Sequence, residues 1–271
     1  MMSQALRAGR MSTNDDAVIK RILDEVGESI KTIPMDKTPA ESGSVVYKKI
    51  REITGVADPY KKIKETSIAE AKHLYPELKQ EIINSDDPLL MAIRVAIAGN
   101  VIDFGMAKKF NLVEDVKKIL TQDFAIFNYT EFKEKLNSAK NILYIGDNSG
   151  ESVFDKLLIE QLGKPVKYAV RGIPVINDVT YDDAVNSGIA EVAEIVSSGV
   201  PAPGAILELC NKEFVDLFYN ADMIISKGQG NYEGLSNVNR DVFFLLKAKC
   251  PVIARDIKVN EDDIILMKAG R

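Results

Sequence analysis

From about residue 140 onward, the chain alternates between short runs rich in β-branched residues and longer stretches with helical spacing. This alternation restricts the fold more than any other feature, because strands separated by helices pair as parallel neighbours in a sheet covered on both faces. The predicted strands are NILYI, VKYAV, AEIV, DMIIS and PVIA, and the predicted helices between them are ESVFDKLLIEQL, TYDDAVNSG and NKEFVDLFY. We therefore expect residues 139–271 to form a three-layer α/β/α, Rossmann-like part with a mostly parallel sheet.

The first 138 residues have a helical pattern instead. Val18, Ile22 and Val26 recur at the spacing that places apolar residues on one face of a helix. Asp87 and Pro88 form a typical helix start, and the segment after them is apolar almost all round, which predicts a buried helix. Residues 1–138 are therefore expected to be a helical N-terminal part that packs on the α/β part.

Composition excludes several function classes. There is no run of 18 consecutive apolar residues, so no membrane partner is expected. Two cysteines are too few for a disulfide framework and indicate a reducing, cytoplasmic location. The net charge is -5 and no dense basic run occurs, so no nucleic-acid partner is expected either. The oligomeric state is left open by the sequence.

The first unusual loop is GDNSGE, which follows the predicted strand NILYI. Ligands of open α/β sheets bind beyond the carboxyl ends of the strands, so this loop lies where a site is expected. Asp147 and Asn148 offer hard oxygen atoms, which Mg²⁺ and Mn²⁺ prefer as ligands. The same residue types are also frequent in turns and helix N-caps, so the loop alone does not establish a site.

Two more polar loops follow predicted strands. RGIPVINDVTYDDA comes after VKYAV, and its Asp178 adds a second carboxylate if the two loops are neighbours in the sheet. SKGQGNYEGL comes after DMII, and its Lys227 leaves a strand end beside two glycines, where a phosphate could be met. The glycines fail the G-x-G-x-x-G fingerprint because the sixth position is Glu233.

A fourth element, AIAGNVIDFG, carries Asn100 and Asp103 three residues apart on a predicted helix face. Such polar groups on an apolar helix need buried partners or a solvated cleft. The single histidine, His73, makes a Ser-His-Asp triad improbable, and the chain lacks the residues of a His/Cys zinc site. An oxygen-rich site for a divalent cation (Mn²⁺, Mg²⁺, Co²⁺ or Ni²⁺) near a lysine remains, and hydrolysis of phosphomonoesters fits it.

Taken together, GDNSGE, RGIPVINDVT, SKGQGNYEGL and AGNVIDFG resemble the damage-control phosphatase family, formerly domain of unknown function 89, in their order and spacing. The resemblance extends over about residues 12–260, and it is closest to the smaller, microbial-type members. It implies an α/β/α domain with a helical N-terminal part. It also implies a metal-dependent phosphatase acting on small phosphorylated metabolites, such as sugar phosphates or damaged metabolites.

The resemblance also implies roles for single residues. The implied metal ligands are Asp147, Asn148 and Asp178. Lys227 is implied as the phosphate ligand, and these four residues together are the implied catalytic residues. Glu151 is implied on the substrate side. Pocket-lining positions are implied for the remaining polar residues of the motifs, namely Asn100, Asp103, Asn177, Asn231 and Glu233.

Two other functions stay open at this point. One is a nucleotide- or cofactor-binding protein without hydrolytic activity, which would use Lys227 and the loop with Gly228 and Gly230. The other is a methyltransferase, since an α/β sheet also suits a nucleoside cofactor at a strand end. The acidic loop GDNSGE argues against a methyltransferase, because it is not the glycine-rich loop expected after a first strand.

Overall fold

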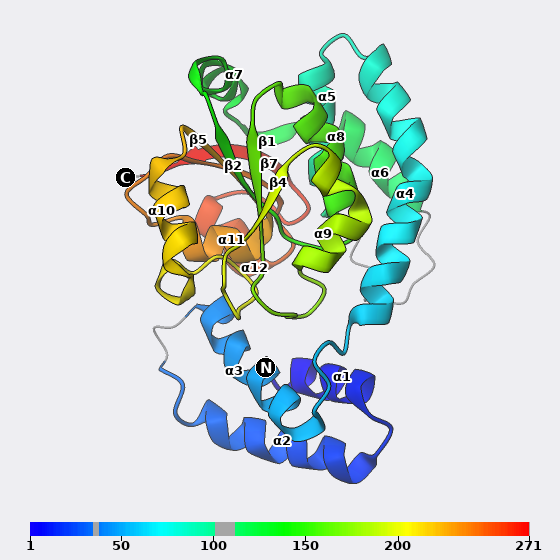
Figure 1. Ribbon diagram of the computed structural model, residues 1–271, viewed down its shortest axis with the longest axis vertical. Coiled ribbons are helices and arrows are strands. Elements are labelled where there is room, and N and C mark those ends of the chain that lie inside the picture. Colours follow the sequence, from blue (N-terminus) through cyan, green and yellow to red (C-terminus); the bar gives the residue numbers. More distant parts are fainter. Residues whose placement is uncertain (35–37, 101–111, 271) are drawn as a thin grey trace.

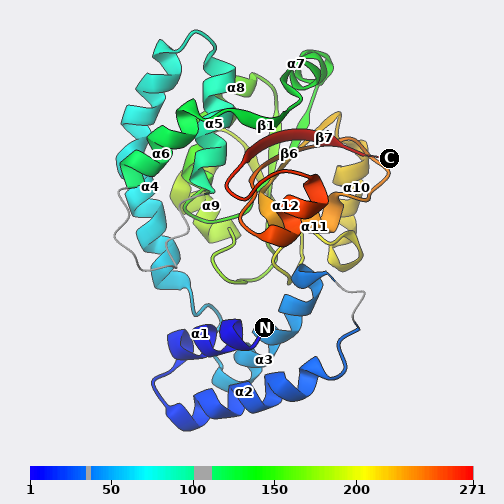
Figure 2. The same cartoon turned by 180° about the vertical axis from the view of Figure 1, so that it is seen from behind.

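The computed structural model describes residues 1–34, 38–100 and 112–270, and these form a sheet with helices on both faces (Figures 1 and 2). The strand order is β1-β7-β6-β5-β2-β3-β4, and every neighbouring pair is parallel except β6 and β7. The predicted α/β class with a mostly parallel sheet is therefore confirmed. The strands are β1 Phe124–Phe127, β2 Ile142–Ile145, β3 Val166–Val170, β4 Glu194–Ser197, β5 Met223–Lys227, β6 Val242–Lys247 and β7 Ile264–Ala269.

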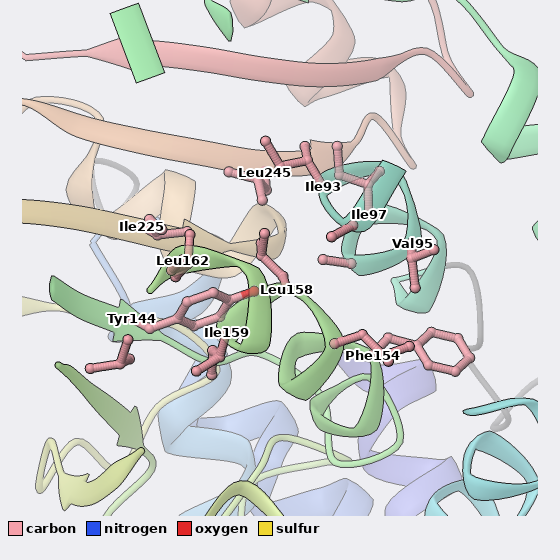
Figure 3. Close-up of a cluster of buried hydrophobic side chains, with 14 of the residues drawn as sticks. Ile93, Val95, Ile97, Tyr144, Phe154, Leu158, Ile159, Leu162, Ile225 and Leu245 are labelled. Atoms are coloured by element: carbon pink, nitrogen blue, oxygen red, sulfur yellow. The ribbon is translucent and has the colours of Figure 1, made fainter. Parts of the chain in front are cut away.

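Two hydrophobic cores lie on the two faces of the sheet. Side chains alternate along a strand, so Ile142 and Tyr144 of β2 join one core while Leu143 and Ile145 join the other. Figure 3 shows the first core, in which Tyr144 packs near residues of α5 and α8. The helices of this face are α4 Lys61–Asn84, α5 Pro88–Gly99, α6 Leu112–Thr121, α7 Tyr129–Ser138, α8 Ser152–Leu162 and α9 Tyr181–Ser187. The opposite face is covered by α10 Lys212–Asn220, α11 Gly228–Leu235 and α12 Pro251–Ile257.

Three N-terminal helices form a small bundle with its own core. They are α1 Met2–Ser12, α2 Asp16–Ile30 and α3 Pro39–Thr54, and they lie together at one end of the molecule (Figures 1 and 2). Val175 and Ile176, from the loop after β3, pack into this core. Arg51 of α3 also donates from Nη1 to the Pro174 carbonyl at 3.1 Å. The bundle therefore contacts the loop at the carboxyl end of β3.

The structure differs from the sequence-based element assignment at residues 251–254 and in strands β1, β6 and β7, which were not predicted. Residues 251–254 were predicted as a strand but begin helix α12, and Pro251 occupies the first helical turn, where its missing N–H costs nothing. Strand β1 lies within the part predicted as helical and pairs with β7. Helices α4 to α7 contribute to the core beneath the sheet, so the boundary at residues 138–139 stays a prediction. Among the helices of the described residues, none combines the length and the apolar character that crossing a membrane requires.

Candidate active site

The three polar loops begin at the ends of adjacent strands. β2 lies between β5 and β3, and all three run parallel. The chain proceeds from β2 to β3 and β4 on one side, whereas β5 and β6 lie on the other side. The boundary between β5 and β2 is thus a topological switch point, where the crevice of an open α/β sheet forms.

Backbone hydrogen bonds join the loops after β2 and β3. Asn148 and Asp178 form an isolated antiparallel bridge. Val179 N–H donates to the Asp147 carbonyl at 2.8 Å, and Ser149 N–H donates to the Asn177 carbonyl at 2.9 Å. The structure therefore brings the predicted ligands Asp147, Asn148 and Asp178 together.

A glycine makes room for Asp147. Gly228 begins α11 directly after Lys227, and its φ of 76° lies in the left-handed region. A Cβ at this position would overlap the Asp147 carboxylate. Only glycine meets both requirements without strain, because it has no Cβ and tolerates positive φ.

Two amides bridge two carboxylates at the centre of the site. Asn100 Nδ2 donates to Asp147 Oδ2 and Glu151 Oε2, both at 3.1 Å. Asn148 Nδ2 donates to the same two oxygens at 3.2 and 3.3 Å. Asn100 Oδ1 is buried and has no hydrogen-bond partner within the described part of the chain. A buried acceptor of this kind favours a cationic or hydrogen-donating ligand beside it.

Asp155 is one residue of the site that the sequence analysis missed, and Arg171 is another. Its Nε donates to Asp178 Oδ2 at 2.5 Å, and its Nη2 lies 3.6 Å from Asp147 Oδ1 and 3.0 Å from Asn231 Oδ1. Its Nη1 is buried without a partner among the described residues. A charged residue directly after the buried strand VKYAV was the available signal. The guanidinium partly neutralises both carboxylates and keeps one unused donor.

Lys227 is fully committed to protein partners. Its ammonium donates to Asp155 Oδ1 at 2.7 Å, to the Ala96 carbonyl at 2.8 Å and to Glu151. An ammonium has three N–H donors, and these contacts use all three. Asp155 also accepts from the Tyr144 hydroxyl at Oδ1 and from the Tyr168 hydroxyl at Oδ2, each at 2.7 Å. The role of Lys227 as a phosphate ligand stays a prediction, and such a contact would replace one of these bonds.

Burial raises the pKa of both aspartates that are predicted to bind the metal, Asp147 and Asp178. Burial raises the pKa of Asp147, and the charges of Asp178 and Glu151 raise it further, against the opposing charge of Arg171. Burial also raises the pKa of Asp178 despite the contact with Arg171. Burial lowers the pKa of Lys227, but Asp155 and Glu151 outweigh this effect, so its pKa is raised. The acidic cluster therefore favours an additional positive charge.

The other predicted pocket residues lie in different places. Asn231 donates to the Gly146 and Lys227 carbonyls at 3.0 and 2.8 Å, so it supports two of the loops. Asn177 lines a pocket beside the N-terminal bundle. Glu233 lines a separate groove with Thr38 and Asp256 and accepts a backbone hydrogen bond from Ala40. Asp103 lies outside the described residues.

The donors suit a hard cation. Within the ranges that the structure describes, no three His, Cys, Asp or Glu side chains converge as a ligand group. The predicted set holds two carboxylates, Asp147 and Asp178, and takes its third oxygen from Asn148. Mg²⁺ and Mn²⁺ accept such sets because they keep several waters. The partnerless Asn100 Oδ1 and the raised pKa of Asp147 are consistent with a cation at this position.

Comparisons with known proteins identify the family. A family model described as the damage-control phosphatase ARMT1-like domain matches residues 1–265. The chain is 34% identical to damage-control phosphatase PH1575 of Pyrococcus horikoshii, over 99% of this chain and 95% of that protein. A damage-control phosphatase of Archaeoglobus fulgidus is 31% identical over 98% of this chain and 95% of its own length.

A solved structure agrees with these matches. The crystal structure of a DUF89 family protein, PH1575 of Pyrococcus horikoshii, has a TM-score of 0.90 and 34% sequence identity, and the match covers 98% of this chain and 95% of that chain. The fold, the family model and the relatives agree with the resemblance carried by the sequence motifs. The chain belongs to the damage-control phosphatase ARMT1-like family.

Proposed function

We propose that this protein is a metal-dependent phosphatase that hydrolyses phosphomonoesters of small metabolites, such as sugar phosphates or damaged phosphometabolites. The names of the family and of its relatives support a phosphatase-type activity. The observation that carries the proposal is the convergence of Asp147, Asn148 and Asp178 from two bridged loops at the switch point of the sheet.

Asp147, Asn148 and Asp178 are the residues that would hold the cation, with Mn²⁺, Mg²⁺, Co²⁺ and Ni²⁺ as candidates. A cation in this position supplies Lewis-acid activation of the phosphoryl group and offsets negative charge in the transition state. In the hydrolysis, the oxygen of water bonds to phosphorus, the bond between phosphorus and the ester oxygen breaks, and that oxygen takes a proton to leave as an alcohol.

The chain's own residues position these groups. Arg171 holds the Asp178 carboxylate through Nε and faces Asp147 with Nη2, and its unused Nη1 donor suits a phosphoryl oxygen. Asn100 and Asn148 fix the orientation of Asp147 and Glu151. Lys227 holds Glu151 and Asp155 in place, so the acidic groups are preorganised before substrate binds.

The structure gives little support to the alternative function, a nucleotide- or cofactor-binding protein without hydrolytic activity. Residues 228–235, which would have formed the glycine loop, are helix α11. Lys227 is buried, and its donors are engaged by Glu151, Asp155 and Ala96. This part of the described chain therefore has no glycine-rich loop that could bind a phosphate next to an available lysine.

The proposal is tested with metal-free enzyme and p-nitrophenyl phosphate, followed by a panel of sugar phosphates, with each of the four cations. We expect turnover only with a cation, and a loss of about 100-fold or more in Asp147→Ala. Asp182→Ala is the matched control, because Asp182 is exposed at the start of α9, outside the cluster. Metal-independent turnover, or unchanged turnover in Asp147→Ala, would overturn the proposal.

A further inference from the structure

A small pocket lies between the N-terminal bundle and the loop after β3. Its volume is about 190 Å³, and its walls include Gln4 and Arg7 of α1, Tyr47 of α3, Tyr60, Ile176 and Asn177. Asn177 immediately precedes Asp178, so the pocket is adjacent to the proposed catalytic cluster. Burial raises the pKa of Tyr47, the charges of Tyr60 and Asp178 raise it further, and the charge of Arg7 lowers it.

The walls of this pocket are held firmly. Tyr47 and Tyr60 are each 5% exposed and hydrogen-bond to one another. Ile176 has a φ of 42°, which is unfavourable for a β-branched residue, and the bundle core packs around it. Strain of this kind persists only where the surrounding structure enforces it, and it is concentrated at ligand sites. The bundle therefore fixes the Ile176–Asn177 wall beside Asp178.

The chemistry of the walls points to the ligand. Arg7 is the one permanently ionised side chain on these walls, and the others are amides, phenols and aliphatic groups. Arg7 is therefore the cationic group that these walls offer to a ligand, next to the acidic cluster of Asp147 and Asp178. Its volume is below the range of about 300–1,000 Å³ that is common for drug-sized ligands, so it suits a short chain.

We propose that this pocket binds the non-phosphate end of the substrate and selects short-chain phosphomonoesters that carry a second anionic group, a carboxylate, directed at Arg7. The inference rests on the proposed phosphatase activity. It adds that the N-terminal bundle supplies specificity, with Arg7 as the residue that distinguishes acidic from neutral substrates. Guanidinium and carboxylate form charge-assisted hydrogen bonds, which are stronger than neutral ones.

The test compares two esters, 3-phosphoglycerate and glycerol 3-phosphate, which differ in a carboxylate against a hydroxymethyl group. We expect wild type to prefer 3-phosphoglycerate by about 10- to 100-fold in kcat/KM, the range that a hydrogen bond to a charged group provides. Arg7→Met should abolish this preference by raising KM for 3-phosphoglycerate far more than KM for glycerol 3-phosphate, while Arg7→Lys should retain part of the preference. Arg10→Met is the control, because Arg10 is exposed on the same helix.

Circular dichroism melts establish that each variant is folded. Equal use of the two esters by wild type, or an equal loss for both esters in Arg7→Met, would overturn the inference while leaving the phosphatase proposal intact. No turnover of either ester or of p-nitrophenyl phosphate with any of the four cations would overturn both proposals. A loss of preference in Arg10→Met equal to that in Arg7→Met would show a general charge effect and also overturn the assignment to the pocket.

Discussion

The backbones of Asn148 and Asp178 pair in an antiparallel bridge, although the two strands that precede them, β2 and β3, are parallel. The bridge closes the loops after these strands against one another, so the side chains of Asp147 and Asp178 both reach Arg171. Two acidic groups that belong to separate strand ends therefore act as one cluster. The following predictions test the interactions that hold this cluster in place.

Replacing Arg171 should lower the free energy of unfolding, because Asp147 and Asp178 are buried and would lose their positively charged partner. Arg171→Met removes the charge that opposes Asp147 and Asp178, and breaking a buried ion pair costs about 3–5 kcal/mol in the free energy of unfolding. We expect millimolar Mn²⁺ to raise the melting temperature of Arg171→Met more than that of wild type, because the cation replaces the lost positive charge. Thermal melts with and without Mn²⁺ measure this, with Arg171→Lys as the variant that keeps the charge. Equal shifts in all three proteins would contradict the prediction.

Lys227 is buried, but we expect it to support activity by holding two acidic groups of the site. Lys227→Ala removes the charge that holds Glu151 and Asp155, so we expect kcat to fall by about 100-fold or more in steady-state assays, as for other positioning groups around metal sites. Lys167→Ala is the control, because Lys167 of the adjacent strand β3 forms a surface pair with Glu194, and such pairs contribute about 0–1 kcal/mol. If Lys227→Ala folds and loses activity only a few-fold, Lys227 has a structural role alone.

Comparing alanine variants at Gly228 and Gly55 distinguishes the cost of backbone strain from the cost of a clash with Asp147. Both have positive φ, 76° and 69°, but a Cβ at Gly55 meets no heavy atom within 4 Å. Gly55→Ala should therefore cost about 1–2 kcal/mol of stability and leave activity unchanged. Gly228→Ala should cost more stability and also reduce kcat, because the added Cβ displaces the Asp147 carboxylate. Urea unfolding and steady-state rates of both variants check this, and equal activities would show that Asp147 tolerates the displacement.

Lys64 provides a pH-dependent contribution to stability. It is buried and donates to Asp183 at 2.6 Å and lies 2.7 Å from Asp58, and although burial lowers its pKa, these carboxylates raise it overall. A raised folded pKa means that the stabilisation is complete below the unfolded lysine pKa of about 10.4 and is lost as pH rises through the folded value. The stability difference between wild type and Lys64→Met should therefore be constant near neutral pH and shrink above about pH 10.4.

Urea unfolding at a series of pH values measures this difference. Lys20→Met is the control, because Lys20 and Asp24 form an exposed pair whose contribution is small at every pH. A wild-type advantage over Lys64→Met that grows above pH 10.4 would contradict the assignment. The result bears on the site because Asp183 also accepts from the Thr180 backbone at the end of the loop that carries Asp178.

The sequence by itself determined the α/β class, the central strands β2, β3 and β5 and the polar loops that follow them, because strand and helix periodicity and turn chemistry are local properties. The tertiary structure alone decided that Arg171 joins Asp147 to Asp178, that Lys227 is committed to Glu151 and Asp155, and that the N-terminal bundle holds Ile176 beside the site. It also decided the helical state of residues 251–257. Partners of buried charges come from distant segments, and which donor meets which acceptor depends on packing that no local pattern encodes.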